Sequence, residues 1–277
     1  MAETPTEWLP PVAPEPQPAD QAFGEKRRRG GGILAALAVL AAKGKALLLL
    51  LPKLKLLTTS GSMLVSIGAY TLIWGWQFAV GFVALLFVHE MGHVIQLRRE
   101  GIKASAPVFI PFMGAVVWAK QLGGNALAEA RVGLAGPVLG SIGAALCLPL
   151  FFLTDNNLFR ALAFTGFFLN LFNLVPVVPF DGGRAMAAMV PAMWFVGLAM
   201  VVAAIFIFPN PILFLFLLFG VTETWRRWKA LKAGGPEQQS YYAVSRRGRV
   251  LVAIVYLGLI AALIGGMYAT HLVRHIP

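Results

Sequence analysis

The sequence predicts an all-α, polytopic membrane protein with about six to seven transmembrane helices and a short β-strand or hairpin segment at the cytoplasmic membrane surface. Of the 277 residues, 58% are hydrophobic and only 13% are charged, whereas about a quarter of the residues in a soluble domain are charged. Several runs reach the roughly 20 apolar residues that a helix needs to cross a bilayer. Basic residues are concentrated between these runs, as they are beside membrane spans.

Seven apolar runs are the predicted spans, and the shortest of them leaves the count at six or seven. The break "PNP" at 209–211 separates the short run from the one before it. Residues 33–57 are also apolar, but four lysines interrupt them, so we expect interfacial helices there rather than a span. The predicted spans cover residues 57–76, 78–97, 132–153, 158–176, 192–208, 212–225 and 250–268.

The distribution of basic residues predicts a multi-pass protein of the cell membrane with a cytoplasmic N-terminus. With that orientation, 21 of the 23 Lys and Arg residues lie in the tail or in loops on the cytoplasmic side. The net charge of +11 is therefore attributed to membrane topology, and no nucleic-acid partner is expected.

The same pattern divides the chain into five parts. Residues 1–31 are Pro-rich and basic and are predicted to be a disordered cytoplasmic tail, followed by interfacial amphipathic helices over 32–56. The predicted membrane core covers 57–225, a basic cytoplasmic loop 226–249, and a last transmembrane helix with a short outside tail 250–277.

One stretch between two predicted spans has the composition of strands. The sequence "APVFIPFMGAVVWAK" at 106–120 is rich in Val, Phe and Ile and contains Gly and Pro. Such a pattern predicts one or two short strands. We expect them at the cytoplasmic membrane surface, either as a structural hairpin or as an edge that pairs with an extended peptide.

The polar residues of highest interest lie inside the second predicted span. The sequence "HEMGH" places His89, Glu90 and His93 in apolar surroundings, where ionisable groups are costly and usually functional. Residues four apart share one face of a helix, so the two imidazoles can hold one Zn²⁺, and Glu90 can reach a water beside it. Core histidines that bond across helices are the alternative.

A catalytic zinc requires a third protein ligand. Asp181 is the strongest candidate, because only Glu90 and Asp181 among the acidic residues lie in apolar surroundings. It follows "NLVPVVPF", in which the prolines prevent a continuous helix, and precedes Gly182 and Gly183, which permit irregular backbone. The other interpretation is an ordinary turn in which Asp181 caps the next helix.

Taken together, "HEMGH" and the later "NLVPVVPFDGG" at 173–183 resemble the paired signature of the site-2 protease family of intramembrane zinc metalloproteases. The segment "AGPVLG" at 135–140 resembles a Gly-Pro segment of the third core helix of that family. The resemblance covers roughly residues 60–185. Many relatives carry a PDZ domain or C-terminal regulatory domains, for which this chain has no room.

The resemblance implies a zinc cofactor held by His89, His93 and Asp181, with Glu90 as the general base. It implies that the partners are transmembrane segments of membrane-protein substrates within the lipid bilayer. Substrate identity, the regulatory trigger and the oligomeric state stay open.

It further implies that Asn173 lies by the site and helps to hold the substrate or the developing oxyanion. The segment "FIPFMGAVV" resembles the membrane-surface strands of the family, which pair with an unwound substrate, and we assign Met113 and Gly114 of this segment to substrate binding.

Three other functions compete with a site-2 type protease. A membrane HExxH protease with a soluble domain would take a Glu as its third ligand, and no later Glu lies in a suitable context. A metal transporter would carry ligands on several spans. A catalytically inactive membrane-embedded binding homologue would have no need for Glu90.

Overall fold

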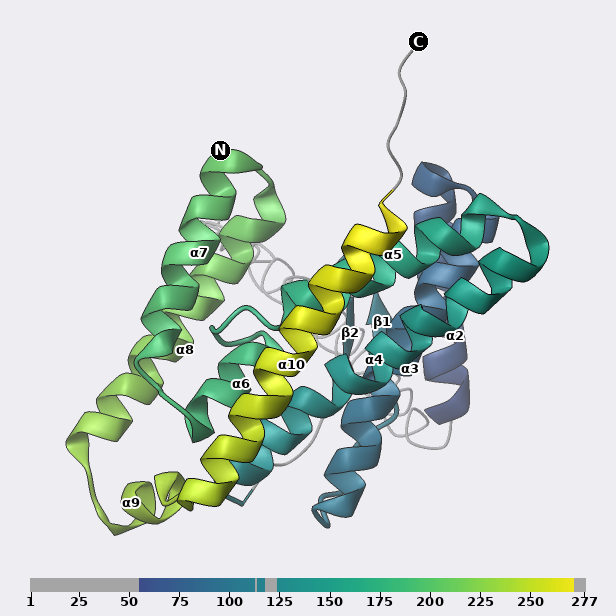
Figure 1. Cartoon of the computed structure of the whole chain (residues 1–277). Coiled ribbons are helices and arrows are strands. Elements are labelled where there is room, and N and C mark those ends of the chain that lie inside the picture. The colour runs from purple at the N-terminus through teal and green to yellow at the C-terminus, as the bar shows by residue number, and fades with distance from the viewer. Residues whose placement is uncertain (1–54, 113, 118–123, 272–277) are drawn as a thin grey trace, which may run out of the picture. The chain divides into compact units, whose positions relative to one another are not determined.

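The structure is a computed structural model that describes residues 55–112, 114–117 and 124–271. The predicted tail and nearly all of the predicted interfacial segment at 32–56 lie outside the described residues. Within them the chain is mostly helical with one small sheet (Figure 1). The helices are α2 (Lys55–Trp74), α3 (Trp76–Arg99), α4 (Ala126–Thr154), α5 (Asn157–Asn173), α6 (Asp181–Ala188), α7 (Met193–Ile207), α8 (Pro211–Ala233), α9 (Pro236–Tyr242) and α10 (Arg246–Thr270), and the strands are β1 (Val108–Ile110) and β2 (Gly114–Val116).

Among the described residues, the helices α3, α4 and α10 are long and apolar enough to cross a membrane, judged by length and composition. The helix α7 is a shorter apolar helix. Each of the seven predicted spans overlaps one helix: α2, α3, α4, α5, α7, α8 and α10.

The helix α4 is the central element, because it packs against α3, α5, α6 and α10. It begins at Ala126, six residues before the predicted span, because the side chain of Asn125 accepts a hydrogen bond from Ala128 N and caps the first turn. The helix therefore includes Glu129 and Arg131, which precede the predicted span. Both lie in the first two turns of α4.

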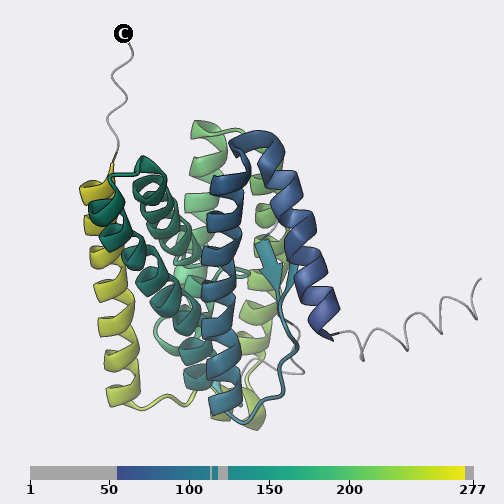
Figure 2. The same cartoon turned by 90° about the vertical axis from the view of Figure 1, so that its right-hand side faces the viewer.

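The predicted strand segment forms an antiparallel hairpin in which Val108 pairs with Val116 and Ile110 with Gly114. Strand β1 is attached to α2, since Phe109 N donates to Ser62 Oγ at 3.0 Å. The turn is held as well, since Phe112 N donates to the buried Tyr70 hydroxyl at 3.0 Å. Figure 2 shows the hairpin between the α2–α3 pair and the rest of the bundle.

The chain between α5 and α6 has no regular structure, as its prolines predict. Residues 174–180 fold over the first turn of α6, so closely that a Cβ added to Gly182 would lie 2.1 Å from Leu174 O. A Cβ on Gly183 would lie 2.3 Å from the carbonyl carbon of Val177. Glycine is therefore required at both positions by this close approach, and α6 packs next to α4.

Candidate metal centre

Three buried side chains from two helices converge on one point. His89 and His93 lie on the same face of α3, and Asp181 is the first residue of α6. Their side chains are 4%, 7% and 7% exposed. The two Nε2 atoms lie 3.1 Å apart, and each lies 3.2 Å from Asp181 Oδ2. Among the described residues this is the cluster of His, Cys, Asp and Glu whose ligand atoms can hold a metal ion.

The three distances fit a tetrahedral zinc site. Zinc–nitrogen and zinc–oxygen bonds of about 2.0–2.1 Å place neighbouring tetrahedral ligands about 3.3–3.4 Å apart. The observed separations of 3.1 and 3.2 Å are within about 0.2–0.3 Å of that spacing. Three donors occupy one triangular face and leave the fourth position to water or substrate, as in catalytic zinc sites.

Hydrogen bonds to the other ring nitrogens direct both Nε2 lone pairs into the cluster. His93 Nδ1 lies 2.8 Å from Val132 O, and because a carbonyl can only accept, Nδ1 must carry the proton. His89 Nδ1 lies 2.8 Å from Oδ1 of Asn170, whose Nδ2 donates to Gly166 O at 2.7 Å. The Asn170 amide is thus oriented to accept from His89. Partners of this kind fix the tautomer and orientation of metal-ligating histidines.

Small residues of α4 make room for this arrangement. A Cβ on Gly136 would lie 2.2 Å from His93 Nε2, and a Cβ on Gly140 would lie 2.3 Å from Asn170 Oδ1. A Cβ on Gly92 would lie 2.2 Å from Ala135 O, so the α3 and α4 backbones touch beside the cluster. The glycines of the "AGPVLG" segment therefore leave room for His93 and Asn170 to lie close to α4.

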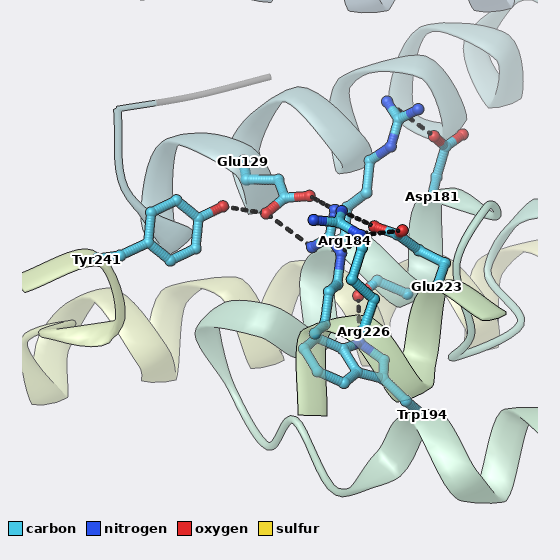
Figure 3. A network of polar contacts seen from close by, with 9 residues as sticks. Glu129, Asp181, Arg184, Trp194, Glu223, Arg226 and Tyr241 are labelled. Atoms are coloured by element: carbon cyan, nitrogen blue, oxygen red, sulfur yellow. Dashed lines mark hydrogen bonds and ion pairs between the residues drawn. The ribbon is translucent and has the colours of Figure 1, made fainter. Parts of the chain in front are cut away.

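The first turn of α6 does not support the interpretation in which Asp181 only caps this helix. The N-cap residue of α6 is Phe180, and no side chain makes a capping hydrogen bond there. The Asp181 carboxylate instead points at the two imidazoles, with Oδ1 lying 3.8 Å from Arg184 Nη1. Figure 3 shows Arg184 and Asp181 facing each other.

Glu90 is half-buried, and within the described chain its carboxylate makes no hydrogen bond or ion pair. It follows His89 on α3, so it lies next to the cluster without belonging to the ligand triangle. This position suits a group that exchanges protons with water.

Among the described residues, the predicted substrate-binding residues make no hydrogen bond to the three ligand side chains. Asn173 is half-buried, and its amide donates to Leu169 O of its own helix at 3.1 Å. Asn170, one turn earlier, makes the contact with His89 that links α5 to the site. Gly114 begins β2 with a φ of 91° and has open space around its Cα, and Met113 lies outside the described residues.

A second buried polar group was missed by the sequence analysis. Glu129 of α4 is 1% exposed, and its Oε1 lies 2.8 Å from Arg227 Nη2 of α8. This contact between Nη2 and Oε1 is an ion pair. In addition, Arg227 Nη1 donates a hydrogen bond to Glu129 Oε2 at 3.1 Å. Tyr241 of α9 also donates to Oε2 (Figure 3). Burial and the Glu129 carboxylate raise the pKa of Tyr241 well above its usual value.

This network reaches towards the metal cluster through Trp194. The guanidinium of Arg227 lies 5.8 Å from the centre of the Trp194 ring. Trp194 is fully buried, and its Nε1 donates to Gly183 O at 2.8 Å, two residues after Asp181. The signal in the sequence was weak, because Glu129 stands near basic residues and before the apolar run.

Comparisons with known proteins agree with this geometry. Residues 77–156 match peptidase family M50, and this range includes "HEMGH" and all of α4. The resemblance to the site-2 protease family is confirmed. A zinc metalloprotease of Methanocaldococcus jannaschii is 32% identical over 129 residues, which are 45% of this chain and 37% of that protein.

Rip3 of Mycobacterium tuberculosis, which carries the provisional name of a zinc metalloprotease, is 29% identical over 138 residues, covering 44% of this chain and 34% of that protein. The aligned region thus spans about a third of the length of these relatives. The family match and the donor cluster together support zinc as the metal.

Proposed function

We propose that this protein is an intramembrane zinc metalloprotease that hydrolyses peptide bonds within or near the transmembrane segments of membrane proteins. The observation that carries the proposal is the buried triangle of His89, His93 and Asp181 with donor separations of 3.1, 3.2 and 3.2 Å. A metal transporter would need further ligand groups along a path, and within the described residues only this cluster is found.

In the proposed hydrolysis the metal and Glu90 have separate roles. A bound Zn²⁺ would polarise the scissile carbonyl and make water acidic enough to react near neutral pH. Glu90 takes a proton from the attacking water while the water oxygen bonds to the carbonyl carbon. It then delivers that proton to the amide nitrogen as the carbon–nitrogen bond breaks. Asn170 and Val132 hold the two imidazoles in their orientation throughout.

The hairpin supplies a place for an extended substrate. Among the described strands β2 pairs with β1 alone, so its other edge is a candidate position for a further strand. A substrate segment that has left its helical conformation can add to such an edge as a strand. The ring of Phe109 in β1 lies 6.4 Å from that of Phe87, which shares a face of α3 with Glu90, three residues later. We assign Met113 and Gly114 to substrate binding on this basis, and Asn173 on the resemblance of its segment to the site-2 protease family.

The membrane arrangement is part of the proposal. We infer a multi-pass protein of the cell membrane with six to seven spans and a cytoplasmic N-terminus, supported by the basic residues outside the apolar runs. The protease core then covers 57–225, between an interfacial segment at 32–56 and a basic cytoplasmic loop at 226–249. The other two parts of the chain are the tail at 1–31 and the last helix with its outside tail at 250–277.

The substitution Glu90→Gln tests the mechanism. It removes the base and leaves the three donors in place, so purified Glu90→Gln should bind as much zinc as the unaltered protein. Co-expression with a library of tagged single-pass proteins should yield cleavage fragments with the unaltered protein. We expect these to fall by roughly 100-fold or more with Glu90→Gln.

Asp155→Asn, at the exposed end of α4, is the matched control and should cleave normally. Full cleavage by Glu90→Gln would refute the proposed mechanism. Loss of zinc from this variant would show that Glu90 belongs to the metal site itself.

A further inference from the structure

In addition to the metal cluster, the structure has a cavity of about 450 Å³ between three helices. One face each of α3 (92–99), α4 (127–139) and α10 (248–255) forms its walls, and we call it the α3–α4–α10 groove. Its lining residues recur three or four positions apart on each helix, as expected when a single helical face lines a groove. Several of them are exposed apolar side chains: Ile95, Val138, Leu251 and Val255.

One end of the groove is basic. Arg99 of α3 and Arg131 of α4 line it there, and both are exposed. The acidic group facing them is Glu100, which lies 3.6 Å from Arg131 and accepts a hydrogen bond from Gln96. Within the described residues Arg99 makes no ion pair. The first turn of α10 adds Arg246, Arg247 and Arg249, giving this end a positive balance.

The three helices present their basic ends together. Figure 1 shows the C-terminal end of α3 and the N-terminal ends of α4 and α10 at the lower side of the bundle, and Figure 2 agrees. From that end the groove runs along α4 from Leu127 to Leu139, which at 1.5 Å per residue is about 18 Å. One leaflet of the hydrocarbon core is about 15 Å thick, so the groove has the length of one lipid leaflet.

We propose that the α3–α4–α10 groove binds an anionic phospholipid of the leaflet on the basic side, with one acyl chain along the groove and the headgroup phosphate between Arg99 and Arg131. The apolar walls match an acyl chain, and guanidinium groups pair with phosphate oxygens through parallel hydrogen bonds. Basic pockets between transmembrane helices select anionic headgroups by this combination. The proposal does not depend on the protease function.

The lipid would also support the site. Gly92 and Ala135 line the groove, and the same two residues form a close contact between the α3 and α4 backbones, beside His93. A chain packed along the groove therefore covers the outer side of the contact that positions the metal cluster.

Photolabelling of the purified full chain tests the proposal. Phosphatidylglycerol and phosphatidylcholine with the same photoreactive diazirine acyl chain would be added at increasing concentrations, and the labelled peptides identified by mass spectrometry. We expect phosphatidylglycerol to label groove peptides of α3, α4 and α10 at much lower concentration than phosphatidylcholine. The double variant Arg99→Gln/Arg131→Gln should raise the half-saturating concentration roughly 30-fold, the effect of two arginines beside anionic lipid.

Two further variants complete the experiment. Arg246→Gln/Arg247→Gln removes two charges at the same end but none from the groove lining, and it should change labelling less than about threefold. Val138→Phe/Val255→Phe fills the groove and leaves its charges unchanged, so it should abolish labelling of groove peptides. This variant tests the proposal independently if the arginine double variant does not fold.

Equal labelling by the two lipids would overturn the proposal, as would labelling that survives the filling variant. Displacement of the lipid by an uncharged transmembrane peptide would assign the groove to a protein partner instead.

Discussion

A single methyl group on α4 offers a sharp test of the metal centre. In Gly136→Ala the new Cβ would lie 2.2 Å from Nε2 of His93, where ordinary contacts begin at 3.4 Å. The imidazole or α4 must therefore move by about 1.2 Å, the difference between these two distances. Zinc sites tolerate displacements of only about 0.2 Å in their ligand distances. The required shift is several times larger, so we expect His93 to be lost as a ligand.

The expected loss of zinc affinity is estimated from the effect of smaller changes at metal sites. Removing a partner that merely orients a ligand lowers metal affinity about 10- to 100-fold. Displacement of a ligand itself should therefore lower zinc affinity by more than about 100-fold, measured by chelator competition on the purified protein. Overpacking should also destabilise the fold by about 1–3 kcal/mol, so thermal unfolding is measured in parallel without metal.

Gly258→Ala is the matched control, because a Cβ at this position of α10 meets nothing within 4 Å. It should leave zinc affinity unchanged and should not lower thermal stability, because alanine favours a helix over glycine by about 0.5–1 kcal/mol. If Gly136→Ala binds zinc as tightly as the unaltered protein, the position of His93 against α4, and with it the triangle, would be refuted.

Two further predictions concern residues that orient or support the site. Asn170→Ala should lower zinc affinity about 10- to 100-fold in chelator competition, because His89 loses its Nδ1 partner. Asn173→Ala is the control and should leave zinc affinity unchanged, because the Asn173 amide bonds only within α5. Equal losses of zinc affinity in the two variants would contradict the assigned roles. Arg227→Met leaves the buried Glu129 without its counterion and with only the Tyr241 hydrogen bond, so it should cost about 3–5 kcal/mol of unfolding free energy, most of it recovered when Glu129→Met is added. The exposed neighbour provides the control: Arg226→Met should cost less than about 1 kcal/mol.

Local geometry explains what the sequence by itself determined. The i, i+4 spacing of His89 and His93 gives both side chains the same face of α3 in any α-helix, so the metal pair could be recognised without a fold. The cost of an acid in apolar surroundings singled out Asp181, and the structure brings its carboxylate to 3.2 Å from both imidazoles. The short hairpin was visible as a β-rich stretch too short and too broken by Pro and Gly to span.

Only the tertiary structure decided which polar residues meet across helices. Asn170 and Asn173 are both on α5, and nothing in their spacing from Asp181 indicates that Asn170 bonds His89 while Asn173 bonds its own helix. Glu129 reads as a loop residue until α4 is seen to begin at Ala126 and α8 brings Arg227 to it. The need for glycine at position 136 is likewise invisible in the sequence, because it arises from how closely α3 approaches α4. Helical periodicity acts between residues four positions apart, whereas the His89–Asn170 and Glu129–Arg227 contacts join residues that are 81 and 98 positions apart in the chain.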